Sequence, residues 1–561
     1  MRVRVVTLSA GAAVSIAFAA LVAQLLLGAT QIGVSTDEPL HVSRTAQWFD
    51  TGWYLPERHL ADGQPVTDID AGRLHAYGAA YGIYGHTVAV GAGIEQWGRP
   101  ERTATAYTAR GVAVAALGLG AAAAVGYALT VATGRKLVGL WGAASVLALP
   151  LWTGYSMFAV KDVPAAAGWT FVTAALVVAL VAKPGWGRPV LVGLLSLIGV
   201  WFSFGVRTAL WVPIATMVVA FGLLVVLHPA RRQLVPAVVA SGTGLIAGVA
   251  AVALLHYRNA VTPAQWLWSS VRTSGDFHWT GTTLTAGRLV AEKPPWWYLP
   301  AWATSSLPML LGFLAVAGVV VAVIAVIRQV RSARPGLATH QRDGAGAILW
   351  AQQALLLPFI ATVGGATMYA GLRQHLYILP AVAALAGYAA HWLTVAERRP
   401  PVRAAGAALL ILALAVPTWE QARLFPYQFV YKNPVAAPVN DRWETDMHWV
   451  SAREGIRRVP AGADVWCYTR STRDLPKDSR PLEIPLCEHR QVTPFAAEQG
   501  DNVADAAGDA DGLRWVLGRK YRGSPPPQGC VEHDSVTRQL RGEEVILSYV
   551  LRCAPHVVDR R

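Results

Sequence analysis

Long uncharged apolar segments recur along about the first three quarters of this 561-residue chain. Each holds about 18 or more mainly apolar residues, which is enough for a helix to cross a bilayer core of roughly 30 Å. These Ala-, Leu- and Val-rich segments lack the alternation of a membrane β-barrel strand. We therefore predict eleven membrane-spanning helices, at residues 5–33, 106–132, 137–156, 164–182, 189–206, 208–227, 233–255, 299–327, 347–367, 375–395 and 404–421.

Charged residues between these segments indicate the orientation in the membrane. The N-terminus and every second loop carry fifteen basic residues against two acidic ones, Asp343 and Glu397. This excess nearly equals the net charge of +14, and positively charged loops stay in the cytoplasm. We therefore expect a multi-pass plasma-membrane protein with a cytoplasmic N-terminus and an external C-terminus, and no nucleic-acid partner. The fifteen residues are Arg2, Arg4, Arg135, Lys136, Lys183, Arg188, Arg231, Arg232, Arg328, Arg331, Arg334, Arg342, Arg398, Arg399 and Arg403.

The hydrophobic pattern divides the chain into two domains. Residues 1–421 form the predicted transmembrane domain, with two long outer loops at 34–105 and 256–298. Long loops commonly carry function. Residues 422–561 have the composition of an ordinary soluble domain, which we expect to fold outside the lipid.

The soluble segment predicts a small mixed α/β domain. Buried strands are expected at 463–468, 513–517 and 545–551, and a helix at 449–458. The Gly-, Ala- and Asp-rich segment 499–512 reads as a loop without assignable chemistry.

All four cysteines lie in this soluble segment, which suits an oxidising compartment. Three disulfide pairings are possible, and four free buried thiols are the alternative. The candidates are Cys467, Cys487, Cys530 and Cys553.

The outer loops are rich in aromatic residues. The first loop favours helices that lie in the membrane interface with their rings at headgroup depth. The second loop ends in Lys293-Pro-Pro-Trp-Trp-Tyr-Leu-Pro300, which is either an interfacial anchor or a substrate contact. The aromatic residues of the first loop are Trp48, Trp53, Tyr54, Tyr77, Tyr81 and Tyr84.

Charged side chains at the outer ends of the predicted helices are candidates for a functional site, because charge at membrane depth is costly. The predicted topology places four such groups on the same side of the membrane. Asp37-Glu38-Pro39 follows the first helix, and Lys161-Asp162-Val163-Pro164 opens the fourth. The others are Arg207, and the pair Arg373 and His375.

Together these groups have the chemistry of a transfer reaction at a phosphate. A carboxylate can accept the proton of a hydroxyl, and cations can neutralise a phosphate leaving group. Each group alone has a simpler explanation: Asp37 could cap a helix, Lys161-Asp162 could start one, and Arg207 and Arg373 could extend to lipid headgroups. No Gly-rich nucleotide loop or HExxH metal motif is present, so we predict neither nucleotide nor zinc.

In order and sidedness, these motifs resemble the GT-C superfamily of membrane glycosyltransferases, and more closely bacterial protein O-mannosyltransferases and aminoarabinose transferases. The likeness includes Gly371-Leu-Arg-Gln-His-Leu-Tyr-Ile-Leu-Pro380 and covers roughly residues 1–450. It implies an inverting transfer of a sugar from a polyprenyl-phosphate donor to a hydroxyl of a glycan, lipid or protein on the outer side. Asp37 matches the catalytic base, with Glu38 as a weaker candidate and Asp162 as the second acid. Lys161, Arg207, Arg373 and His375 match phosphate-binding positions.

The chain departs from that family in two motifs. Ala159-Val160 stands where relatives often have Asn-Pro or His-Pro, and Glu444-Thr-Asp-Met-His-Trp449 replaces a Glu-x-Asp-Tyr-Trp-Gly-like segment. The Ala-, Arg- and Trp-rich composition resembles that of actinobacterial proteins, which would imply decaprenyl phosphate carrying mannose or arabinose. A divalent cation stays open as a cofactor.

Two other functional classes compete with this one. A lipid or glycan transporter or flippase would place polar residues near the middle of the membrane, often within internal repeats, and we find neither pattern. A non-catalytic scaffold would leave the four charged motifs without a purpose.

Overall fold

Every apolar segment predicted to cross the membrane contains a helix. The computed structural model describes residues 2–65, 76–181, 187–228, 230–256, 263–277, 279, 281–291, 293–331, 341–394, 400–460, 463, 465–468, 513–520 and 530–553. Within them, eight helices are long and apolar enough to span a bilayer. They are α1 (Arg2–Gln31), α5 (Ala104–Thr133), α8 (Asp162–Ala179), α9 (Gly187–Phe204), α10 (Trp211–Leu227, with the preceding turn η2, Thr208–Leu210), α11 (Arg231–His256), α15 (Gln341–Val363) and α17 (Pro400–Leu424).

The other three predicted segments form shorter or bent helices. Helices α13 (Tyr298–Ser306) and α14 (Met309–Arg331) are bent by 115° at their junction, which makes the pair either a broken ninth span or a re-entrant loop. Helices α6 (Lys136–Leu147) and α16 (Ile378–Thr394) are apolar but shorter, and α7 (Pro150–Tyr155) continues the segment of α6. The prediction of a polytopic helical membrane protein is confirmed.

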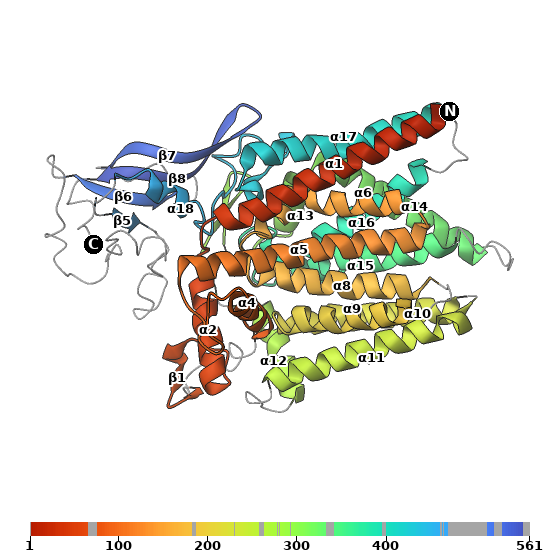
Figure 1. Ribbon diagram of the computed structural model, residues 1–561, viewed down its shortest axis with the longest axis horizontal. Coiled ribbons are helices and arrows are strands. Elements are labelled where there is room, and N and C mark those ends of the chain that lie inside the picture. The colour runs from red at the N-terminus through yellow and green to blue at the C-terminus, as the bar shows by residue number, and fades with distance from the viewer. Residues whose placement is uncertain are drawn as a thin grey trace.

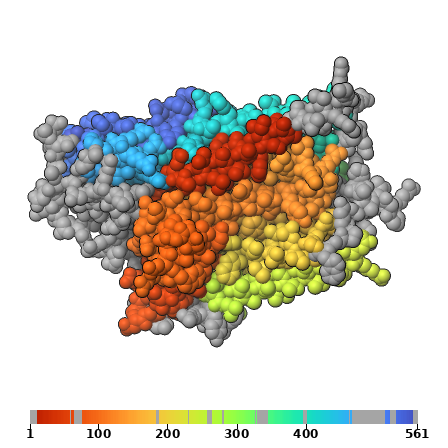
Figure 2. All heavy atoms as spheres, in the orientation of Figure 1, coloured from red at the N-terminus to blue at the C-terminus, as the bar shows by residue number. Residues whose placement is uncertain are grey.

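Helix α8 forms the centre of the bundle, because all of its residues are buried. It packs against α5 and α9. A Cβ atom on Gly168 of α8 would lie 2.5 Å from the backbone nitrogen of Ser203 in α9, so this glycine allows the two helices to approach closely. Helices α10 and α11 expose Leu, Ile and Val side chains, as expected of surfaces that face lipid. Figure 2 shows α1 on the surface of the bundle, and α17 packs beside it.

One end of the bundle carries the C-terminal sheet, and we call it the sheet end (Figure 1). The same end carries α2 (Glu38–Thr51), α4 (Ala80–Gly91) and α12 (Pro263–Gly275) (Figure 1). Two aromatic residues of the first long loop, Tyr54 and Tyr81, lack the exposure expected of rings that anchor a protein in the membrane interface. Both are buried inside the protein: the Tyr54 hydroxyl lies 2.9 Å from His41 Nδ1, and the Tyr81 hydroxyl donates to the carbonyl of Arg110.

Short elements complete this end of the molecule. Two hairpins, β1–β2 and β3–β4, lie in the two long loops. The remaining elements are η1 (Glu57–His59), β1 (Leu60–Ala61), β2 (Gln64–Pro65), β3 (Thr283–Thr285), β4 (Arg288–Val290), η4 (Arg373–His375), η5 (Gln428–Val430), η6 (Pro434–Ala436) and α18 (Ala452–Arg457).

The C-terminal sheet has four strands in the order β5-β6-β8-β7. Strand β5 (Val465–Tyr468) runs parallel to β6 (Arg514–Arg519), and β8 (Glu543–Cys553) pairs antiparallel with both β6 and β7 (Cys530–Leu540). The three predicted strands and the helix α18 are confirmed, whereas β7 was not predicted because its outward positions are mostly polar.

A disulfide joins Cys530 to Cys553 across β7 and β8. If all four cysteines pair, Cys467 is left with Cys487. Cys487, the side chain of Cys467 and the segment 499–512 lie outside the described residues.

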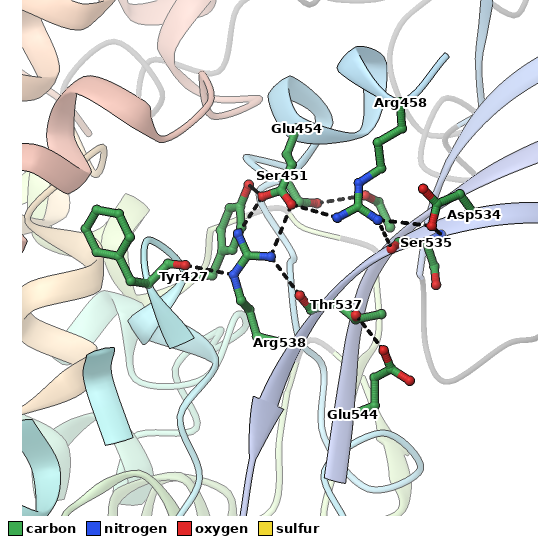
Figure 3. Close-up of polar contacts among 11 residues, drawn as sticks. Tyr427, Ser451, Glu454, Arg458, Asp534, Ser535, Thr537, Arg538 and Glu544 are labelled. Atoms are coloured by element: carbon green, nitrogen blue, oxygen red, sulfur yellow. Dashed lines mark hydrogen bonds and ion pairs between the residues drawn. The ribbon is translucent and has the colours of Figure 1, made fainter. Parts of the chain in front are cut away.

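A polar network centred on Glu454 ties the sheet to the bundle (Figure 3). The Glu454 carboxylate of α18 accepts hydrogen bonds from Arg538 of β7, from Arg458 and from the Tyr427 hydroxyl. Arg538 Nε also donates to the carbonyl of Phe425, just after α17. These contacts fix the sheet against the chain that leaves the last long helix.

Candidate functional site

The Asp37 carboxylate lies at the sheet end, immediately before α2. Asp37 occupies the N-cap position of that helix, but its side chain makes no capping hydrogen bond. Its Oδ2 instead lies 3.0 Å from Lys161 Nζ and 2.7 Å from Arg373 Nη1. The simple explanation that this residue only caps a helix therefore does not describe its contacts.

The second carboxylate, Asp162, lies at the start of the central helix α8. Its side chain is almost fully buried and forms an ion pair with Arg207 through Oδ1. Its Oδ2 lies 3.5 Å from Arg373 Nε. The N-terminus of a helix favours negative charge, which adds to the stabilisation of a buried carboxylate here.

Two tight turns place the arginines. Arg207 lies between α9 and η2, and its backbone nitrogen donates to the carbonyl of Ser203. Arg373 begins η4 after Ala370 and Gly371, whose φ angles are 59° and 67°. A Cβ on Gly371 would lie 2.8 Å from the Trp302 ring, so this turn needs glycine. Both arginines contact carboxylates, so the simpler explanation of extension to lipid headgroups does not describe their contacts.

The structure thus brings together five of the seven charged residues singled out in the sequence. Three cations, Lys161, Arg207 and Arg373, surround the two carboxylates, and we call this set the charged cluster. The cluster has a net positive charge. Burial alone would raise the pKa of Asp37, but the charges of Lys161 and Arg373 hold that pKa well below its usual range. Asp37 is therefore ionised at neutral pH.

The other two candidates lie outside the charged cluster. His375 is buried, and its Nδ1 has no hydrogen-bond partner within the described part of the chain. Glu38, the residue after Asp37, is also buried. Neither contacts a residue of the charged cluster through an ion pair among the described residues.

Glu38 has its own surroundings. It lines two small hollows of about 10 Å³ each, which is room for about one water molecule. Burial raises the pKa of Glu38 to about 8, although the charge of Arg110 opposes that rise. The side chain is consequently protonated at neutral pH, in contrast to Asp37.

His448 belongs to the site but was missed in the sequence. Its ring lies beside Arg373, with Nε2 3.2 Å from Arg373 Nη1. Its carbonyl accepts a hydrogen bond from the nitrogen of Thr36, one residue before Asp37. Burial, and next the charge of Arg373, lower the pKa of His448 to about 3, so the ring is neutral and can accept from the guanidinium.

The C-terminal sheet holds the segment that carries His448. Arg519 of β6 donates to the carbonyl of Met447 at 2.6 Å, and the Thr445 hydroxyl donates to the carbonyl of Ile546 in β8. The Asp446 carboxylate accepts from the nitrogens of Val450 and Ser451. The motif around Glu444, which departs from the family pattern, therefore lies against the site.

The sequence left a divalent cation open as a cofactor. Over the residues that the structure describes, no group of three or more His, Cys, Asp or Glu side chains is placed to hold a metal ion. The carboxylates of the charged cluster are engaged by Lys161, Arg207 and Arg373. We assign no metal ligand.

The arrangement can bind a phosphate next to a carboxylate base. Two arginines and one lysine supply directional donors, and arginine in particular can form two parallel hydrogen bonds with one phosphate. Asp37 is the more accessible of the two carboxylates, with 32% of its side chain exposed against 3% for Asp162. It is therefore the one that an incoming group can reach.

Comparison with known proteins gives only distant structural similarity. No protein-family profile matches the chain, and no curated protein matches it. The crystal structure of ArnT from Cupriavidus metallidurans, bound to undecaprenyl phosphate, is 11% identical with a TM-score of 0.49, over 97% of this chain and 98% of that one. The archaeal oligosaccharyltransferase AglB from Archaeoglobus fulgidus, in complex with an inhibitory peptide and a dolichol-phosphate, is 13% identical with a TM-score of 0.42, over 85% and 64%. Similarity at this level identifies neither an activity nor a substrate.

Proposed function

We propose that this chain is a GT-C-type membrane glycosyltransferase that moves a sugar from a polyprenyl-phosphate donor to an acceptor hydroxyl. The observation that carries the proposal is the charged cluster. Groups from four separate segments of the chain meet at one end of a membrane bundle, with one accessible carboxylate and a net positive charge. The order of motifs that resembles the GT-C superfamily points to the same chemistry.

In the proposed reaction, the acceptor oxygen attacks C1 of the sugar from the face opposite the phosphate. The new C1–O bond forms while the bond from C1 to the phosphate oxygen breaks, and its electron pair stays on the phosphate. Asp37 accepts the hydroxyl proton as the general base. Lys161, Arg207 and Arg373 stabilise the phosphate monoester that leaves. The anomeric configuration is inverted.

The low pKa of Asp37 in the free protein fits this scheme if the donor changes its surroundings. Lys161 and Arg373 contact Asp37 directly. A bound phosphate competes for those two cations, and each contact that Asp37 loses raises its pKa and its strength as a base. Donor binding would thus prepare the carboxylate for the acceptor.

We also propose that the site faces the outside of the cell. The support is the excess of basic residues at the N-terminus and in every second loop of the predicted topology, which puts the loops that carry the site residues on the other side of the membrane. A reporter that is active only outside the cytoplasm should work when fused after Arg561 and fail when fused near Arg334. The opposite pattern would place the site in the cytoplasm and contradict the proposal.

The proposed activity is tested with purified protein in proteoliposomes. The protein should consume polyprenyl-phosphate mannose or arabinose, release polyprenyl phosphate, and form a glycoside of opposite anomeric configuration, measured by NMR. Transfer with retained configuration would exclude Asp37 as a simple general base. Movement of the lipid across the bilayer without any cleavage would favour a transporter instead.

A further inference from the structure

Four aromatic side chains from three loops meet beside the charged cluster. Tyr77 precedes α4, Phe277 and Trp279 follow α12, and Tyr369 precedes η4. The Phe277 ring lies 6.3 Å from Tyr77 and 6.2 Å from Tyr369, and Trp279 stacks on Tyr369 with ring centroids 4.5 Å apart. We call these four residues the aromatic strip.

The aromatic strip borders the cations directly. The Tyr77 ring centroid lies 5.1 Å from Lys161 Nζ, and the Tyr369 ring centroid lies 5.3 Å from the Arg373 guanidinium carbon. Phe277 lies between these two tyrosines. A phosphate held by Lys161 and Arg373 would therefore have aromatic rings next to it at both cations.

Anchoring in the membrane interface does not explain these positions. Trp268 and Trp296, from the same outer loop, are 70% and 74% exposed, as expected of rings that face lipid. Tyr369 is buried, and Tyr77, Phe277 and Trp279 are only partly exposed. The strip faces the charged cluster rather than the bilayer.

We propose that the aromatic strip is the subsite for the sugar ring of the donor. This proposal rests on the proposed function. In a glycosyl phosphate, the sugar joins the phosphate through a single oxygen, so the ring must lie against whatever side chains border the phosphate-binding cations. An aromatic face packs well against the apolar C–H face of a sugar, which gives the strip both affinity and selectivity for a ring.

The test separates binding of the sugar from binding of the phosphate. Dissociation constants are measured in nanodiscs for polyprenyl phosphate, and for the tighter of its mannose and arabinose derivatives. Phe277→Ala should weaken the binding of the sugar-bearing lipid by about 3- to 10-fold, which is the range for one lost aromatic contact. The same substitution should change the dissociation constant for bare polyprenyl phosphate by no more than about twofold. Phe277→Tyr should restore wild-type affinity, and Trp296→Ala, an exposed aromatic outside the strip, should change neither constant.

The possible failures are distinguishable. Equal weakening of both lipids, or no weakening of either, would overturn the sugar subsite while the phosphate site stands. If the wild-type protein binds neither lipid, the proposed function itself fails.

Discussion

Replacement of Arg373 by lysine isolates the geometry of the phosphate site from its charge. Arg373 Nη1 lies 2.7 Å from Asp37 Oδ2 and beside His448, while its Nε lies 3.5 Å from Asp162 Oδ2. A lysine ammonium is a compact charge without the planar set of donors of a guanidinium, so it cannot contact all of these groups at once. Because the charge stays in place, the buried carboxylates keep a counter-ion and the protein should still fold.

The expected effect on donor binding follows from one lost charge-assisted hydrogen bond. Such a bond contributes roughly 1–3 kcal/mol, which corresponds to about a 5- to 150-fold weaker affinity. The measurement is the dissociation constant for polyprenyl phosphate in nanodiscs at fixed ionic strength, because salt screens such contacts.

Arg288→Lys is the matched control for this substitution. Arg288 is an exposed arginine of β4 that lies over the Trp297 ring, outside the charged cluster. It should leave the affinity unchanged. Unchanged donor affinity in both Arg373→Ala and Arg207→Ala would refute the assignment of these arginines to phosphate.

Three further outcomes follow from contacts around the site. His448→Ala leaves the Arg373 guanidinium without its imidazole acceptor and should lower turnover about 10-fold or more in steady-state assays. His448→Asn keeps an acceptor and should recover part of that turnover. Equal turnover in the wild-type protein and the His448→Ala variant would contradict this role. The pKa of Glu38 is raised from 4.5 in the unfolded chain to about 8 in the folded protein. The stability that protonated Glu38 contributes is therefore fully present below pH 4.5 and is lost as the pH rises toward 8. Over that range the free energy of unfolding should fall by about 1.4 kcal/mol per pH unit. Glu38→Gln should therefore flatten the fall of the thermal midpoint between pH 5 and pH 8, and an unaltered slope would show that Glu38 is already ionised. Finally, the Cys530→Ser variant should lack the disulfide between Cys530 and Cys553. A thiol titration that finds four free thiols in the native wild-type protein would contradict that bond.

The long helices could be predicted because their signal is local. A run of apolar residues must form a helix in lipid, whatever its neighbours are, since every backbone polar group needs an internal partner. The basic loops and the charged motifs at helix ends are likewise visible in the sequence. Strand β7 was missed because the outward side chains of this exposed strand hide the alternation that marks a buried one.

The site itself depends on contacts over long distances in the chain. Asp37 and Arg373 are 336 residues apart, and only the fold shows that they touch. His448 was missed because it lies in a motif that departs from the family pattern, within a segment that reads as soluble. Tyr77 was assigned to the membrane interface because an aromatic residue in an outer loop gives the same pattern whether it faces lipid or a buried cation.

The central claim is that Asp37 is the general base of a glycosyl transfer. Asp37→Asn keeps the shape of the side chain and removes its charge, and Asp162 stays in place to neutralise Arg207 and Arg373. The most direct measurement is the rate of transfer from a polyprenyl-phosphate sugar by purified protein, with donor binding measured in the same preparation. We predict a turnover about 10²- to 10⁴-fold lower than wild type with donor affinity largely retained. Transfer by Asp37→Asn at the wild-type rate would contradict the mechanism.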